Sequence, residues 1–453
     1  MSQILPVPGH LPSYWLSEPH KLHNLRSTPE LPATCDIVII GAGFAGVTTA
    51  YHILKQCTEN EINIPNILIL EARELCSGAT GRNGGHTKVK VPTLAAVALA
   101  HGARKASEMQ AYVHTIIAGL KEIVEDEDID CEFELRRSWD VQLDTDESSR
   151  LKMIYDKSRK EGQAWTKDLS WIEGEEKVRQ VTSITGAVSA CSSSSCSFWP
   201  YKFVSQLLAR MIERYPELNV QTTTPVTTLR YDEKRKENIL STERGEVKAG
   251  KVVFATNGYT AGLIEEFKGV IVPIRGMATH IVPEKKVHPH LSNTYNIDYG
   301  KGMGVDYLNP RPDGGIVVGG GGWRFKDDRA SWYGNFNDAV GFKSEVEEYW
   351  NGYMQRNFLG WEGSGAKVDK VWVGIMGGTP DGFAHVGRVP NKINQWILAG
   401  FNGGGMALIL TASKAVAKMT LNDIGFMDVQ EEFGLMDVMA TSLERLKKAE
   451  QEK

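Results

Sequence analysis

Long apolar runs, cysteines and excess positive charge are all scarce in this sequence. No uninterrupted apolar stretch reaches about 18 residues, so no membrane-spanning helix is predicted. The N-terminus lacks the basic patch and apolar segment of a secretory signal. Six cysteines among 453 residues are too few for a disulfide framework, so we expect a reducing, cytoplasmic location. The formal net charge of −5 disfavours a nucleic-acid partner.

Two of the cysteines, Cys191 and Cys196, flank a run of serines in the stretch CSSSSC. Two sulfurs without nearby partners cannot complete a tetrahedral metal site. We therefore predict a plain loop here and no metal site.

A glycine-rich turn follows the first apolar strand. In CDIVIIGAGFAGVTTAYHIL, residues 35–54, the strand 36–40 leads into G-x-G-x-x-G spacing and then into an apolar pattern of helical period. Gly41 allows the tight turn, Gly43 lets a pyrophosphate approach the backbone, and Gly46 lets helix and strand pack closely. The helix start offers free N–H groups to phosphates. The predicted contacts here are Gly41, Gly43, Phe44, Ala45 and Gly46.

The next strand, NILILEARE, ends at Glu71. A carboxylate at the tip of the second strand can accept hydrogen bonds from both ribose hydroxyls. It would repel a 2′-phosphate, which argues against NADP. From these motifs NAD and FAD fit equally.

A second glycine-rich turn, CSGATGRNGGHTK over residues 76–88, favours FAD. It suits a chain that continues along the dinucleotide to a flavin ring, not a simple nicotinamide dehydrogenase. Here the sequence resembles the flavoprotein family of D-amino-acid oxidase, glycine oxidase, sarcosine oxidase and γ-glutamylputrescine oxidase, and SGATGRNGG looks most like the last of these. The resemblance implies an α/β fold: a Rossmann-like FAD-binding domain plus a second, α+β substrate domain with a mostly antiparallel sheet.

The order of the predicted elements supports two domains. Residues 106–125 have the pattern of a helix, 131–143 of a strand and 147–162 of a polar surface helix, and these do not alternate as βαβ units. RPDGG, residues 311–315, is typical of a hairpin turn. The resemblance implies an FAD-binding domain over 33–105, 200–270 and 371–430, a substrate domain over 106–199 and 271–370, an N-terminal extension over 1–32, and a C-terminal helix or tail over 431–453.

The last motif, AGFNGGGMALIL over residues 399–410, has four glycines within six positions. We expect a strand over 395–399, a glycine loop, and a helix from about Gly405. In the family such a loop lies against the flavin ring, so that backbone N–H groups and the positive helix end approach the flavin edge.

The resemblance implies further cofactor contacts. Val226 would touch the adenine through its backbone, and the turn 255–258 would lie beside the dinucleotide. Besides the residues already named, the predicted FAD contacts are Glu71, Ala72, Arg73, Thr80, Gly81, Arg82, Asn83, Gly84, Gly85, His86, Val226, Thr256, Asn257, Gly258, Gly377, Asp381, Gly400, Asn402, Gly403, Gly404, Gly405 and Met406.

Some residues depart from the family pattern. Relatives that tether the flavin through a cysteine carry it at the position of Gly374, and the offset of His86 does not match relatives with a histidyl tether, so we predict non-covalent FAD. Sarcosine oxidase-like chains bind a substrate carboxylate with a lysine in the last loop, where this chain has Ala407. That puts a carboxylate clamp in doubt.

Candidates for substrate contacts come from the second domain. Lys88 matches a basic residue near the flavin in relatives and could tune the flavin or assist oxygen. Candidate anion anchors are Arg275, Arg311 and Arg324, and candidate aromatic walls are Tyr259, Tyr307, Trp323 and Trp332. For each arginine and aromatic, a structural contact is the simpler interpretation. The residues we select as catalytic candidates are Lys88, Trp323 and Arg324.

The sequence thus predicts an FAD-dependent oxidase of a small-molecule amine or amino acid. A hydride would leave the carbon next to nitrogen, and oxygen would accept the electrons and give hydrogen peroxide. A flavin dehydrogenase with another acceptor, and a non-catalytic flavin-binding module, stay open as alternatives. The sequence predicts neither the individual substrate nor the oligomeric state.

Overall fold

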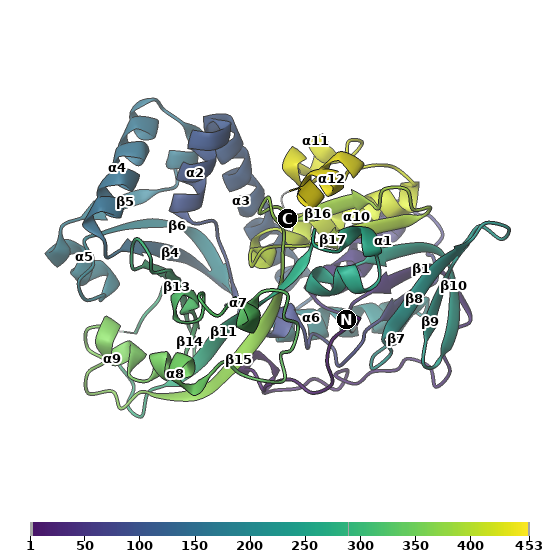
Figure 1. Ribbon diagram of the computed structural model, residues 1–453, viewed down its shortest axis with the longest axis horizontal. Coiled ribbons are helices and arrows are strands. Elements are labelled where there is room, and N and C mark those ends of the chain that lie inside the picture. Colours follow the sequence, from purple (N-terminus) through teal and green to yellow (C-terminus); the bar gives the residue numbers. More distant parts are fainter. Residues whose placement is uncertain (1–2, 289, 452–453) are drawn as a thin grey trace.

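The computed structural model describes residues 3–288 and 290–451 and contains two β-sheets side by side (Figure 1). The first sheet has a parallel centre in the order β17-β10-β1-β2-β7, with β16 antiparallel at one edge and the β8–β9 hairpin joined to β10. Its strands are β1 (Thr34–Ile40), β2 (Ile67–Leu70), β7 (Leu218–Gln221), β8 (Val226–Asp232), β9 (Glu237–Thr242), β10 (Gly245–Phe254), β16 (His385–Arg388) and β17 (Gln395–Ala399).

Both faces of the first sheet are covered, as the continuous apolar runs of β1 and β2 require. Alternate residues of β1, such as Ile37 and Ile39, join a core cluster with α1 (Phe44–Glu59), α6 (Pro200–Arg214) and α10 (Ile409–Asn422). Their neighbours Val38 and Ile40 join a second cluster with β8–β10 and the segment 264–271. The carboxyl ends of β1 and β2 therefore lie between two packed layers, one on each face of the sheet.

The second sheet has the order β15-β11-β14-β13-β12-β4-β6-β3, with β5 paired to β6. All of its pairs are antiparallel except β12 with β4. Its strands are β3 (His86–Thr87), β4 (Glu134–Gln142), β5 (Ser170–Glu173), β6 (Ser189–Ser197), β11 (Val272–Val282), β12 (Thr294–Asp298), β13 (Val305–Pro310), β14 (Ile316–Gly320) and β15 (Lys367–Gly378). The predicted fold class, a Rossmann-like α/β part with an α+β part whose sheet is mostly antiparallel, is confirmed.

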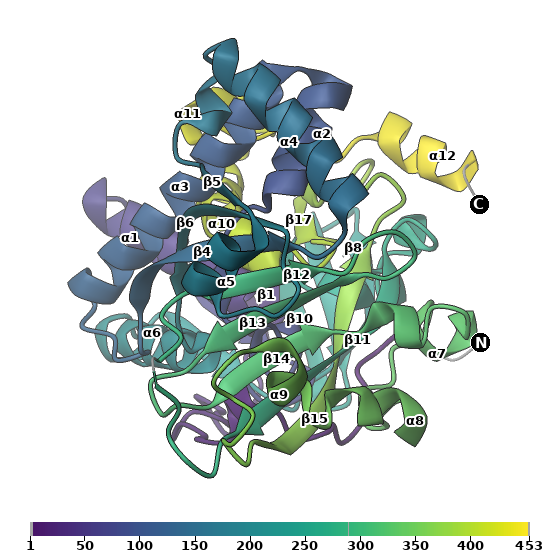
Figure 2. The same ribbon diagram turned by 90° about the vertical axis from the view of Figure 1, so that its left-hand side faces the viewer.

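The other helices belong mostly to the second sheet, and Figure 2 shows α2, α3 and α4 gathered on one side of it (Figure 2). They are α2 (Val91–His101), α3 (Ala103–Asp126), α4 (Thr145–Lys160), α5 (Glu175–Thr182), α7 (Arg329–Trp332), α8 (Ser344–Glu347), α9 (Tyr353–Asn357), α11 (Gln430–Phe433) and α12 (Leu443–Gln451). None of the helices within the described ranges has the length and apolar character that crossing a membrane requires.

Two local predictions had different outcomes. The hairpin turn at RPDGG is present, because β13 and β14 pair antiparallel with Tyr307 opposite Gly319. The prediction of a loop for the serine run was wrong: these residues form β6, between β4 and β3. Some of the small side chains have polar partners, as where Ser194 Oγ donates to Asp168 Oδ1 at 2.9 Å, whereas the hydroxyls of Ser193 and Ser197 are buried without a partner among the described residues. Cys191 and Cys196 are buried free thiols on this strand.

Candidate functional site

One cavity of about 1100 Å³ is lined by both sheets and by turns from distant parts of the chain. Most of the residues predicted to contact FAD line it. They are Gly41, Gly43, Phe44, Ala45, Glu71, Ala72, Arg73, Thr80, Arg82, Asn83, Gly84, His86, Val226, Thr256, Asn257, Asp381, Asn402, Gly403, Gly404, Gly405 and Met406. The fold therefore brings the predicted motifs into one place.

The remaining predicted contacts are glycines that do not themselves line the cavity. They are Gly46, Gly81, Gly85, Gly258, Gly377 and Gly400, and a Cβ on each would lie within 3.0 Å of a neighbouring atom. A Cβ on Gly258, for example, would lie 2.8 Å from the carbonyl oxygen of Met376, and one on Gly377 would lie 3.0 Å from Cα of Gly400. These glycines shape the cavity through packing between turns.

The first glycine turn leaves a helix end open to an anion. Gly41 has φ +110°, and a Cβ there would lie 2.7 Å from the carbonyl oxygen of Ala255. Gly43 precedes α1 without a capping side chain, and the first turn of α1 contains no acidic residue. Thr80 Oγ1 accepts the N–H of Phe44 at 2.8 Å. The N–H groups of Gly43 and Ala45, which line the cavity, and the positive potential of the helix start remain for a phosphate there.

Glu71 is fixed at the tip of β2. Its Oε2 accepts the N–H of Ala42 at 2.8 Å, and its Oε1 accepts the N–H of Arg73 at 3.0 Å. Burial raises the pKa of Glu71, and the backbone donors oppose that rise. The carboxylate is thus an immobile acceptor beside the glycine turn.

The second glycine turn is held by its own side chains and by the N-terminal segment. Asn83 donates through Nδ2 to the carbonyl of Thr80 at 2.9 Å and accepts the N–H of Gly85 at 2.7 Å. The Trp15 indole donates to the carbonyl of Asn83 at 2.5 Å. A Cβ on Gly85, which has φ +66°, would lie 2.5 Å from the Trp15 ring. The turn is therefore rigid before any ligand binds.

The C-terminal glycine loop reaches the same cavity. Gly403 has φ +80°, and the Met406 carbonyl accepts from Thr87 Oγ1 at 3.1 Å. The helix begins later than predicted: a 3-10 turn, η8 (Gly405–Ala407), precedes α10. The reason is Leu408, which has φ −130° and whose carbonyl accepts from Tyr112 OH at 2.8 Å.

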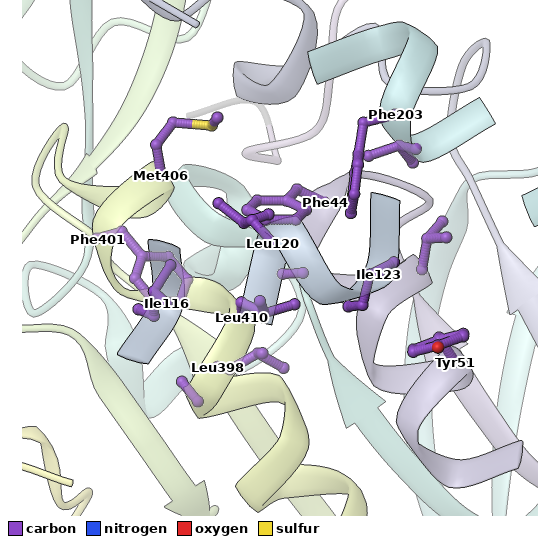
Figure 3. Packing of buried hydrophobic residues seen from close by; sticks show 14 of the residues in the cluster. Phe44, Tyr51, Ile116, Leu120, Ile123, Phe203, Leu398, Phe401, Met406 and Leu410 are labelled. Carbon is purple, nitrogen blue, oxygen red and sulfur yellow. The ribbon is translucent and has the colours of Figure 1, made fainter. Parts of the chain in front are cut away.

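The turns from the two ends of the chain also share one core. Phe44 after the first glycine turn, and Phe401 and Met406 of the C-terminal loop, belong to a single buried cluster. Figure 3 shows Phe44 beside Leu120 of α3 and Phe401 beside Ile116 of the same helix, while the Met406 side chain points away from them (Figure 3). This packing fixes the two glycine motifs relative to one another.

Three buried polar atoms of lining residues have no partner among the described residues. They are Nδ1 of His86, the hydroxyl of Tyr259 and Nε of Arg275. Buried polar groups are nearly always hydrogen-bonded, so such atoms indicate a missing polar ligand. Together with the open helix end and the fixed Glu71, they fit a dinucleotide cofactor.

Lys88 lies on the wall contributed by the second sheet. Its Nζ donates to Ser138 Oγ at 2.6 Å. Burial lowers the pKa of Lys88 to about 7, and the nearby Asp140 carboxylate opposes this shift. Asp140 accepts the N–H of Val91 at 2.6 Å and also bonds Asn296 Nδ2, while burial raises its pKa. The site therefore holds an amine that changes charge near neutral pH.

The other two catalytic candidates do not line the cavity. Trp323 packs against Tyr299 and Tyr349, with ring centroids 5.2 and 5.4 Å away, and Arg324 is exposed. β14 ends at Gly320, and Gly321, with φ +61°, turns the chain so that both side chains leave the wall. Of the remaining candidates, Tyr259, Arg275, Tyr307 and Trp332 line the cavity and Arg311 does not.

Several lining residues were not predicted. Leu5 and Pro6 of the N-terminal extension reach the cavity, as do Met109 and Val113 of α3. The apolar period of α3 marked Met109 and Val113 as buried, but periodicity cannot tell a core face from a cavity wall. For Leu5 and Pro6 the sequence carried no signal.

Comparison with known proteins gives a consistent result. The chain matches the family model described as FAD dependent oxidoreductase (DAO) over residues 36–419. Over 76 residues it is 30% identical to gamma-glutamylputrescine oxidoreductase of Escherichia coli (strain K12), a stretch that covers 17% of this chain and 16% of that protein.

Two solved structures illustrate the fold. L-amino acid deaminase from Proteus vulgaris, with its specific insertion sequence deleted, has a TM-score of 0.67 at 16% identity, covering 94% of this chain and 98% of that one. Glycine oxidase from Geobacillus kaustophilus has a TM-score of 0.67 at 17% identity, covering 89% and 99%. At these identities the likeness shows a shared fold alone.

Proposed function

We propose, from its membership of the family of FAD-dependent oxidoreductases, that the chain is an oxidase of a small-molecule amine or amino acid. This membership confirms the family resemblance and the FAD cofactor that were predicted from the sequence. One observation carries this proposal: glycine turns at 41–46, 78–85 and 403–405 meet at a single cavity that continues along the second sheet. Such a cavity can hold the dinucleotide at one end and a substrate at the other.

Bound FAD supplies the redox chemistry, which is transfer of a hydride from the carbon next to the substrate nitrogen to flavin N5, with oxygen as the acceptor and hydrogen peroxide as the product. The amine has to be neutral for this step, because a protonated nitrogen has no electron pair to form the C=N bond. The imine product then hydrolyses in water.

The residues of the chain have three tasks in this proposal. The open end of α1 and the carboxylate of Glu71 hold the diphosphate and the ribose. The N–H of Gly404 donates to the carbonyl of Phe401, and the other N–H groups of the loop 403–405 and the start of the 3-10 turn would stabilise negative charge at the flavin edge. Lys88, with a pKa of about 7, takes up the proton that a substrate ammonium loses on entering the cavity.

We further propose that FAD is bound without a covalent link. Gly374, at the position where relatives carry a tethering cysteine, lines the cavity, and a Cβ there would already lie 3.2 Å from Cβ of Arg82. His86 is half-buried, and its ring stands 5.5 Å from that of Tyr307 at 81°. A cytoplasmic location remains a prediction.

The test begins with the absorbance spectrum of the purified protein before and after acid precipitation. We expect a flavin spectrum that moves entirely to the supernatant. An anaerobic panel of amines and amino acids should then bleach the flavin, and air should restore the colour with formation of peroxide. Bleaching that air does not reverse would favour the dehydrogenase alternative. Bound flavin that no amine or amino acid bleaches would favour a non-catalytic module.

A further inference from the structure

The cavity has an apolar branch beside the C-terminal glycine loop. Side chains from α2, from α3 and from the segments after the loop share this character: Val97, Met109, Val113, Leu408, Ile409 and Met436. Two contacts hold the branch together. Tyr112 OH donates to the carbonyl of Leu408 at 2.8 Å, and Lys105 Nζ lies 3.0 Å from Asp437 Oδ1, next to Met436.

The branch opens next to the predicted flavin edge. The carbonyl of Met406, in the glycine loop, accepts from Thr87 Oγ1, directly before Lys88. The same short segment then continues to Leu408 and Ile409 on the α3 side. A substrate whose nitrogen lies near Lys88 can therefore extend its substituent between α2 and α3.

The arginines of the wall are not available to clamp a carboxylate. A carboxylate next to the reacting carbon is bound best by two parallel N–H donors of one guanidinium. In the described chain, three arginines line the cavity. Arg73 already makes such a pair, with Asp338, at 2.8 and 3.0 Å.

The other two arginines are held by backbone carbonyls. Arg82 donates to the carbonyls of Ser77, Val373 and Leu11 at 2.8, 2.8 and 2.9 Å. Arg275 donates through Nη1 to the carbonyl of Ser331 at 2.8 Å and through Nη2 to those of residues 340 and 341. Its Nε is buried and has no acceptor among the described residues, but with both terminal nitrogens engaged this guanidinium does not present two parallel donors.

The lysines of the wall do not replace the missing clamp. Lys88 is half-buried and donates to Ser138, and Lys326 donates to the carbonyl of Gly302 at 2.8 Å. Lys90 is exposed, where solvent and salt screen its charge. Above pH 7, where Lys88 is largely neutral, an α-carboxylate would thus enter an apolar region without a desolvated positive partner, which is costly.

We propose that the substrate is an amine with an apolar substituent and without a carboxylate on the reacting carbon. This inference rests on the proposed function, since it assumes that the protein oxidises amines. It separates this chain from enzymes that act on free α-amino acids.

The experiment compares matched pairs by anaerobic flavin reduction in the holoprotein. The pairs differ only in the α-carboxylate: isoamylamine with leucine, and 2-phenylethylamine with phenylalanine, each amino acid as both enantiomers. We expect the amine to reduce the flavin at least about tenfold more efficiently. Along the series from propylamine to hexylamine, the efficiency should rise about fourfold for each added methylene, as for transfer of a CH₂ group from water.

Two variants on one helix test the branch itself. Val97→Asp places a charge in the branch, and we expect it to abolish the gain per methylene. Leu99→Asp makes the same change at an exposed position of α2 that does not line the cavity, and it should leave the series unchanged. The flavin content of both variants reports whether they fold.

The outcomes distinguish the two proposals. An amino acid that reduces the flavin better than its amine would overturn the inference and leave the proposed oxidase intact. A flat methylene series, or an equal effect of the two aspartates, would also overturn the inference. If neither member of any pair reduces bound FAD, the proposed function fails and the inference fails with it.

Discussion

The close packing of Gly46 against the turn before it makes a sharp test of the cofactor site. A Cβ at this position would lie 1.9 Å from the carbonyl oxygen of Gly41, 3.0 Å from its carbonyl carbon and 3.3 Å from Ile39 Cγ2. Real Cβ contacts are essentially never shorter than 3.0 Å. In Gly46→Ala, α1 must therefore move away from the turn by roughly 1 Å, which for an overpacked site costs about 1–3 kcal/mol.

This movement displaces the N–H groups that we propose to hold the diphosphate. A charge-assisted hydrogen bond contributes about 1.5–3 kcal/mol, so losing one corresponds to about 10- to 100-fold weaker binding. We expect that loss when Gly46→Ala apoprotein is titrated with FAD and the quenching of flavin fluorescence is followed.

Gly363→Ala is the control, because its Cβ would meet nothing within 4 Å and its φ is not left-handed. Its FAD affinity should match the unmodified protein. Circular dichroism should show that both variants fold. If folded Gly46→Ala bound FAD within twofold of the unmodified protein, the role given to this helix end would be refuted.

Three further perturbations test the structure. Asp338→Asn leaves Arg73 buried without its ion-pair partner and should lower the free energy of unfolding, measured by urea titration, by about 3–5 kcal/mol. In the same assay, Glu147→Gln, which removes a surface ion pair, should lower it by less than about 1 kcal/mol. Lys88 has a pKa of about 7 in the folded protein against its usual pKa of 10.5, so only the unfolded state holds its proton between those values. Stability should then rise with pH above 7, by at most about 1.4 kcal/mol per unit, relative to Lys88→Met; a parallel pH dependence of both proteins would contradict the low pKa. All six cysteines are free thiols, so the thiol titre in denaturant should be six without reductant, and a lower titre would reveal a disulfide.

The features that the sequence predicted well are those whose cause is local. β1, the turn at Gly41 and the start of α1 are consecutive, and the positive φ of Gly41 follows from the chain reversing within a few residues. Motif spacing can report such a turn without knowledge of the rest of the fold. The hairpin between β13 and β14 belongs to the same class.

The serine run of β6 shows where local reasoning fails. Nothing in CSSSSC favours a strand by propensity or by alternation of apolar residues. The strand forms because β4, β5 and β3 all pair with it, and those partners lie far away in the sequence. Tertiary pairing therefore overrode the local preference.

The candidate anion anchors show why the chemistry of a site is harder to predict than its position. The sequence marks Arg275 as a cation in the substrate domain, and the fold does bring it to the cavity. Whether its guanidinium can bind a substrate depends on acceptors that only tertiary structure supplies, here the carbonyls of residues 331, 340 and 341. The same holds for Arg82, whose partners come from three separate segments. A charged residue type in the right region is thus a weak predictor of substrate charge, since the neighbours decide whether its donors face the ligand or the protein.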